Sequence, residues 1–147
     1  MLEPIEIIYD VKSLVGSCYI EIKPGKYVSE HWGETSIYFT DEHFALLSRA
    51  IVKYYARYSP WGLSEIDRRT WALILDELEK LKSLLQNNPT VDDIEKYSVF
   101  WYVETTKNNF AENLTKNVAD LLRVVTEFQA WITENSKDNA YISILGI

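Results

Sequence analysis

The 147-residue sequence has a single cysteine, Cys18, so no disulfide can form within the chain. Such a composition is typical of proteins in a reducing compartment, and we expect a cytoplasmic protein. No stretch approaches the roughly 18 uncharged apolar residues that suggest a membrane span. The first residues also lack the basic start and the apolar run of a signal peptide. The sequence therefore predicts neither a membrane protein nor a secreted one.

Glycine and proline are scarce, with five and four residues, and no two glycines are adjacent. The chain has no glycine-rich phosphate loop, no nucleophile motif, no internal repeat and no low-complexity segment. A chain of this length can bury about two thirds of its unfolded surface, so it needs neither a metal nor a disulfide for stability. We expect a single domain over residues 1–147.

Basic residues are fewer than acidic ones, 15 against 22, and the formal net charge is −7. The imbalance is concentrated: residues 1–40 hold six acidic side chains against three basic ones, and residues 90–104 hold four against one. An acidic surface repels phosphates, which argues against a nucleic acid and for a basic protein as the partner. The alternative is that the acidity serves solubility alone.

Large apolar residues recur at alternating spacings of four and three between residues 110 and 132, which places them on one stripe of a helix. Asn109 can cap the start of this helix, with Glu112 completing a capping box. We expect the rest of the chain to pack around it. The stripe consists of Phe110, Leu114, Val118, Leu121, Val125, Phe128 and Ile132. The opposite face, expected to be solvated, carries Glu112, Lys116, Asn117, Asp120, Arg123 and Glu127.

Four short segments have the composition and alternation of strands: residues 5–9, 17–23, 34–40 and 141–147. The first three predict an antiparallel meander with one wet face, joined by the Pro24-Gly25 turn and by a loop over residues 26–33. The last is expected to return to the same sheet. In the second strand, one face carries Cys18, Ile20 and Ile22, and the other carries Tyr19, Glu21 and Lys23.

Helices are predicted from Thr40, which can cap a helix reaching Tyr58, and from Ser64, with an apolar stripe reaching Leu85. Thr90 can cap a third helix from residue 91, while residues 98–104 fit either a helix or a strand. The expected fold class is α+β. A small antiparallel sheet, made of three N-terminal strands and a C-terminal strand, packs against three or four helices.

Metal-ligand chemistry is confined to His31, Glu34 and His43, with Cys18 as a further candidate, and their spacing matches no closed zinc site. Glu34 with His31, or Asp41 with His43, could act as an acid–base pair, although no catalytic motif accompanies them. We predict no catalytic residue, no metal and no cofactor. A small enzyme or ligand-binding domain with a His/Glu cleft remains an alternative.

Trp32 lies in a polar, acidic loop, flanked by Glu30, His31 and Glu34. A large aromatic ringed by polar groups is typical of an interface anchor. We therefore predict a partner-binding surface in which Trp32 and Tyr38 are the anchors. Carboxylates on that surface would pair with lysines and arginines of the partner, and the candidates are Glu21, Glu30, Glu34, Asp92, Asp93 and Glu95.

Four features of the chain are considered together: its acidity, its small α+β architecture, the segment His31-Trp-Gly-Glu34 and the C-terminal segment Ile-Ser-Ile-Leu-Gly-Ile147. In these features the chain resembles the immunity proteins of bacterial polymorphic-toxin and contact-dependent inhibition systems. The resemblance implies a stoichiometric inhibitor that binds a toxin, often a basic nuclease, inside the producing cell. It implies no nucleic acid or membrane partner. A homodimeric structural protein that buries the aromatic residues is a further alternative.

Overall fold

The computed structural model of the chain describes residues 4–101 and 103–147. Over these residues it has a four-stranded antiparallel sheet and six α-helices, which confirms the α+β class. The strands are β1 (Tyr19–Pro24), β2 (Ile37–Thr40), β3 (Leu63–Asp67) and β4 (Tyr141–Leu145). The helices are α1 (Asp41–Ala45), α2 (Ser48–Tyr54), α3 (Arg68–Leu85), α4 (Val91–Ile94), α5 (Val103–Glu112) and α6 (Leu114–Ser136), and a 3-10 turn covers Val11–Ser13.

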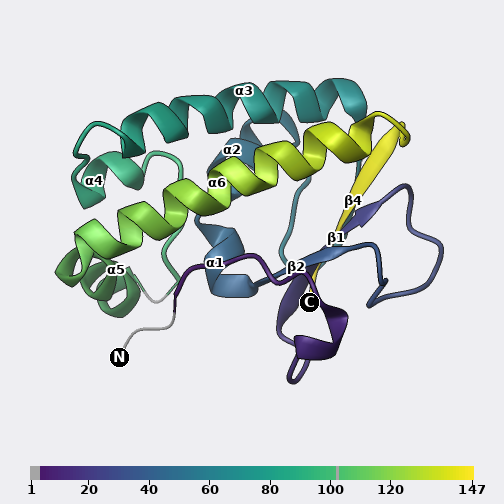
Figure 1. Ribbon diagram of the computed structural model, residues 1–147, viewed down its shortest axis with the longest axis horizontal. Coiled ribbons are helices and arrows are strands. Elements are labelled where there is room, and N and C mark those ends of the chain that lie inside the picture. Colours follow the sequence, from purple (N-terminus) through teal and green to yellow (C-terminus); the bar gives the residue numbers. More distant parts are fainter. Residues whose placement is uncertain (1–3, 102) are drawn as a thin grey trace.

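The two longest helices, α3 and α6, run antiparallel to each other and lie side by side (Figure 1). The strand order in the sheet is β2-β1-β4-β3, so the C-terminal strand is central. Ile20 and Ile22 of β1 are buried in the core shared with these helices, as their alternation predicts. The other face of β1 carries Glu21, which is paired with Tyr38 on one side and with Leu145 on the other.

Two expected strand assignments are wrong. Residues 5–9 form no strand and make a single bridge, between Ile8 and Tyr38. In its place the sheet contains β3, Leu63–Asp67, where the sequence predicted the start of a helix at Ser64. Pairing with β4 overrides the local helix signal, and Asp67 caps α3 instead by accepting a hydrogen bond from the Thr70 N–H at 2.8 Å.

The predicted helix over residues 110–132 is divided at Asn113, which has φ −122° and ψ 42° and separates α5 from α6. Asn109 therefore lies inside α5 and caps nothing. The apolar register of the second part is confirmed, since the side chains at 121, 125, 128 and 132 are all buried. The helix predicted after Thr40 is likewise divided, into α1 and α2, although Thr40 does cap it by accepting from the His43 N–H at 3.3 Å.

Thr90 caps α4 as predicted, in a reciprocal capping box with Asp93, but the helix ends at Ile94. Residues 98–100 belong to neither a helix nor a strand, and α5 begins at Val103. The Val99 N–H donates to the Ala45 carbonyl at 2.9 Å, so this segment packs against α1. Of the described helices, none has the length and apolarity required to cross a membrane.

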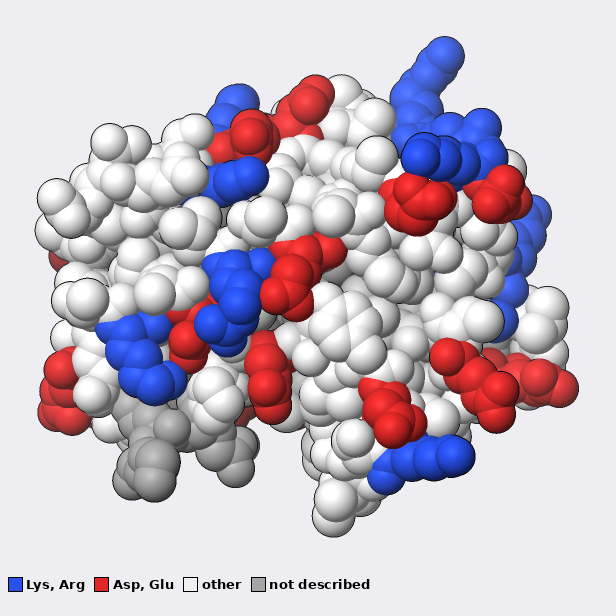
Figure 2. All heavy atoms as spheres, viewed as in Figure 1, with Lys and Arg blue, Asp and Glu red and all other residues white. Residues whose placement is uncertain are grey.

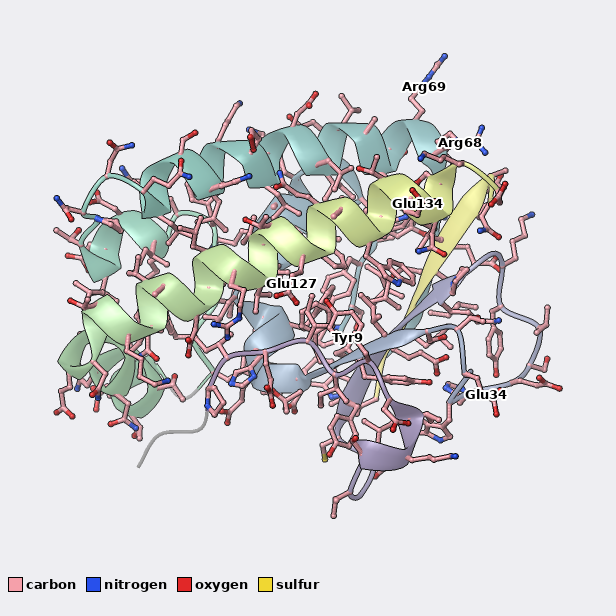
Figure 3. All side chains as sticks on the ribbon, in the orientation of Figure 1. Tyr9, Glu34, Arg68, Arg69, Glu127 and Glu134 are labelled. Atoms are coloured by element: carbon pink, nitrogen blue, oxygen red, sulfur yellow. The ribbon has the colours of Figure 1, made fainter. Side chains whose placement is uncertain are left out.

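Asn117 and Asp120 were expected on the solvated face of the long helix, and this is wrong, because both are buried. The Asp120 carboxylate is buried and accepts from the Ile5 N–H at 3.2 Å and from Lys116 Nζ at 2.9 Å. The N-terminal segment covers this part of α6. A second hydrogen bond holds the N-terminal segment to α6: Tyr9 Oη donates to Glu127 at 2.7 Å (Figure 3).

We expect this anchoring to depend on pH. Burial acts to raise the pKa of Asp120, but its hydrogen bonds to Lys116 and to Ile5 outweigh burial and hold the pKa below the ordinary value of 3.8. The pKa of Asp120 is lower in the folded protein than in the unfolded chain. The ionised carboxylate therefore stabilises the fold above about pH 4, and this stabilisation is lost as the pH falls through the folded-state pKa. Asp120→Asn should therefore destabilise the protein clearly at pH 6 and less at pH 3. Urea midpoints of both proteins at the two pH values test this, and a constant difference would contradict it.

Candidate interaction surface

The loop over residues 26–36 is tied to the middle of β1 by one buried carboxylate. Glu21, only 1% exposed, accepts from the Trp32 N–H at 2.6 Å, from the Gly33 N–H at 3.0 Å and from Ser36 Oγ at 2.7 Å. A Cβ at position 33 would lie 3.0 Å from Ser36 Oγ, so any other residue would have to displace this hydroxyl slightly. Glu21 is therefore an internal anchor for the loop and, in this conformation, presents little surface to a partner.

Trp32 is held with φ at +62°, in the left-handed region. For a residue other than glycine this backbone conformation costs roughly 1–2 kcal/mol. Its ring stacks on Tyr38 with centroids 6.0 Å apart and meets the edge of Tyr19 at 6.4 Å. The side chain remains 40% exposed, as its loop sequence predicts. Strain that keeps a large aromatic in solvent is the pattern found at functional sites.

Tyr38 is fully buried, with its hydroxyl donating to the Gly33 carbonyl. Burial raises the pKa of this hydroxyl to about 12, with the Glu21 charge as the next cause, so it stays protonated as a donor. The predicted role of Tyr38 as a directly contacting anchor does not fit this burial. It supports Trp32 from below instead.

Trp32 shares a depression of about 570 Å³ with Trp61. The depression is also lined by Tyr19, Glu21 and His31, and a neighbouring one, of about 320 Å³, extends it to Leu63. We call this pair of depressions the aromatic groove. It lies on the face of β1 and β4 opposite the core.

Trp61 reaches the groove because the turn before β3 lies directly against the end of β4. The Gly146 N–H donates to the Gly62 carbonyl, and the Ile147 N–H donates to the Pro60 carbonyl, both at 2.9 Å. A Cβ on Gly146 would lie 2.7 Å from the Gly62 nitrogen, so only glycine permits the approach. The Trp61 ring is 69% exposed, with Trp101 at 6.0 Å behind it.

Two further depressions lie next to the aromatic groove: both share Tyr19 with it, and both are also lined by Thr40 and His43. Another of about 360 Å³ shares His43 and reaches α5 and α6. We call the connected series the furrow. Among the described residues that line it there is no lysine or arginine, and its carboxylates are Glu6, Glu21, Asp41 and Glu42.

Glu30 and Glu34 are exposed on either side of Trp32, as the sequence predicts. Figure 3 places Glu34 on the loop, away from α6, and Figure 2 shows acidic side chains at this end of the molecule. Neither carboxylate has an ion pair among the described residues. Both are exposed beside a groove that no described lysine or arginine lines, an arrangement that attracts positive charge.

The acidic residues predicted near position 92 lie elsewhere. Asp92 and Asp93 belong to α4 and Glu95 follows it directly, and α4 lies at the opposite end of the molecule from the loop (Figure 1). Lys107 pairs with Asp92 at 2.9 Å and with Glu95 at 3.2 Å, while Asp93 accepts from the Thr90 N–H. The structure therefore does not bring these three carboxylates together with Trp32, and Lys107 neutralises part of their charge.

Cys18 was expected on the buried face of the second strand, and this is wrong. The strand begins one residue later, at Tyr19, and Cys18 is exposed and lines the furrow. His31 contacts Tyr27, with 3.3 Å between Nε2 and Oη, and lines the aromatic groove, whereas His43 lies on α1 in the adjoining depressions. Within the described part of the chain, no three His, Cys, Asp or Glu residues are arranged to hold a metal ion.

The predicted interface left out four residues that line the furrow. Tyr19 shares a strand face with Glu21 by simple alternation, so the pattern contained that signal. Trp61 could be identified only as a tryptophan in a turn, and its position depends on β4. Asp41 and Glu42 lie at a helix start, where negative charge is favourable in any case, so the sequence pattern alone does not indicate a binding role.

The described residues form an α+β fold in which the exposed side chains of Trp32 and Trp61 line one surface depression. Comparisons of the chain with protein-family models, with curated proteins and with solved structures found no match.

Proposed function

We propose that this chain is an immunity-type protein, which neutralises a basic toxin inside the producing bacterial cell by stoichiometric binding through the furrow. One observation carries the proposal. A strained, exposed Trp32 lies in a surface lined by carboxylates and, among the described residues, by no lysine or arginine.

The aromatic groove supplies the short-range part of binding. Trp32 is held in place before a partner arrives, by Glu21 below its backbone and Tyr38 below its ring. Little conformational entropy is then lost when a partner covers the indole, which is how preorganised anchors increase affinity. Tryptophan in a pocket with a polar rim is also the commonest kind of binding hot spot.

The carboxylates supply the long-range part. Glu30 and Glu34 beside the groove, with Asp41 and Glu42 further along the furrow, attract a positively charged surface and repel nucleic acid. A toxin that acts on nucleic acid carries such a positive surface where its substrate binds. An acidic protein that covers that surface excludes the substrate without itself needing a catalytic group.

The partner should be captured from native lysate with the tagged protein, and its association and dissociation rates measured at low and high salt. Because steering charges are screened over about 8–10 Å, association with the wild-type protein should slow steeply as salt rises. Glu34→Lys should slow association and weaken this salt dependence. Asp76→Lys, an exposed charge reversal of the same size on α3, is the matched control and should change association less.

Trp32→Ala should accelerate dissociation by about 30-fold, corresponding to about 2 kcal/mol for a hot spot. Leu73→Ala removes an exposed apolar side chain of similar exposure, 44%, from α3 and should leave dissociation unchanged. The captured partner's toxic activity should disappear at a one-to-one ratio. Recovery of a homodimer alone, or of a partner that stays active when bound, would refute the immunity function.

A further inference from the structure

We propose that the aromatic groove receives an arginine side chain of the partner, positioned against the indoles of Trp32 and Trp61. This inference rests on the proposed function and specifies the ligand chemistry at its centre. The depression shared by the two tryptophans measures about 570 Å³, within the range of pockets that enclose small ligands.

The two tryptophans line one depression. Trp32 is backed by Tyr38 at 6.0 Å and Trp61 by Trp101 at 6.0 Å, so each ring is supported by a second ring and still has exposed area. Such rings attract cations through their quadrupole, and tryptophan does so most strongly of the aromatic side chains. The supporting rings also keep the indoles from collapsing onto each other.

The charges around the groove favour a cation. Glu21 lines the shared depression, but it is 1% exposed and both of its oxygens accept hydrogen bonds from the loop, so it adds negative charge beneath the groove and no contact surface. Glu30 and Glu34 flank Trp32 and are exposed. No lysine or arginine among the described residues lines either depression of the groove. A guanidinium would thus meet aromatic side chains in the groove, with the exposed carboxylates of Glu30 and Glu34 beside Trp32 and no lysine or arginine among the described residues that line the groove.

Arginine fits this site better than lysine. Its guanidinium is planar, so it stacks on an indole, and it is less strongly hydrated than an ammonium group, so it loses less on entering an apolar space. A lysine ammonium would reach the same carboxylates but could not stack. The proposal therefore predicts an order of binding, with arginine first, lysine second and a neutral isostere last.

The test uses the five tryptophans of the chain as reporters, through the indole N–H signals in a proton–nitrogen NMR spectrum. The probe is N-acetylarginine methylamide, and the matched neutral control is N-acetylcitrulline methylamide. The Trp32 and Trp61 signals should shift saturably with the arginine probe, and Trp101 should follow because it stacks on Trp61. Trp71, buried with its Nε1–H bonded to the Ile142 carbonyl, and Trp131 on α6 are internal controls and should not shift.

Trp32→Ala and Trp61→Ala should each weaken the arginine probe by about two- to fivefold, as expected of exposed cation–π pairs. Trp32→Phe should restore part of the loss, because an aromatic face is kept. Equal shifts with arginine and citrulline, or shifts at Trp131 as large as those at Trp32, would overturn the proposal. Its failure is separate from failure of the proposed function: salt-dependent capture of a toxin would stand without an arginine subsite, and arginine binding would stand if no toxin were found.

Discussion

Replacing Phe128 with alanine should lower the free energy of unfolding by about 3–5 kcal/mol, a large part of the roughly 5–15 kcal/mol typical of a domain. The ring is fully buried, and its centroid lies 5.5 Å from Phe39, 6.3 Å from Phe44 and 5.9 Å from Trp71. It therefore joins α6 to β2, α1 and α3 at once. Truncation would leave a cavity that these separate elements cannot all close.

Urea unfolding followed by circular dichroism measures this effect. Thr133→Ala, on the exposed side of the same helix, is the control and should change the free energy of unfolding by less than about 0.5 kcal/mol. Similar urea midpoints for the two variants would mean that Phe128 is not at the centre of the core.

Replacing Glu21 with glutamine should release the loop and, with it, Trp32. The carboxylate accepts from two backbone N–H groups and from Ser36 Oγ, and hydrogen bonds to a charged group are worth about 1.5–3 kcal/mol each. An amide has only one acceptor oxygen, so its NH₂ group would face a donor that the carboxylate had satisfied. Without these bonds the left-handed backbone of Trp32 is no longer held.

Hydrogen exchange gives the direct measurement. The amides of Trp32 and Gly33 should exchange at least tenfold faster in Glu21→Gln if one such bond, about 1.5 kcal/mol, is lost. The partner should also dissociate faster, as with Trp32→Ala. Glu30→Gln, on the same loop and exposed, is the matched control and should leave both amides unchanged. Unaltered exchange in Glu21→Gln would show that the loop is held by other contacts.

The helix starts at Thr40 and Thr90 and the periodic apolar faces were predictable because they depend on neighbours in sequence, whereas the starts predicted at Ser64 and Asn109 were wrong. Thr40 and Thr90 cap helices through side-chain bonds that reach three residues ahead. The buried stripe from Leu121 to Ile132 follows from the helical repeat alone. Both long predicted helices are divided in the structure, one at residues 46–47 and the other at Asn113. These divisions were not predictable, because packing decides where one helix ends and the next begins.

Exposure of Trp32 was also predictable, from its polar, acidic neighbours. The sequence did not predict which residues lie around Trp32 in the folded protein. Glu21 and Tyr38 have opposed positions on two strands, and this register buries both beneath the loop. Trp61 joins them only through the turn that packs on Gly146, 85 residues away in sequence.

By itself, then, the sequence determined the α+β class, the acidity, the helix caps at Thr40 and Thr90 and the exposure of Trp32, because propensity, periodicity and composition act over a few residues. Only the tertiary structure decided that Leu63–Asp67 is a strand, that Asp120 is buried, and that Asp92 lies far from Trp32. Each depends on contacts between residues distant in sequence. Leu63–Asp67 is a strand because it pairs with β4, and Asp120 is buried where it accepts from the Ile5 N–H. The position of Asp92 follows from where α4 packs. Such contacts compete with local preferences at comparable energies, and the pairing that buries the most surface prevails.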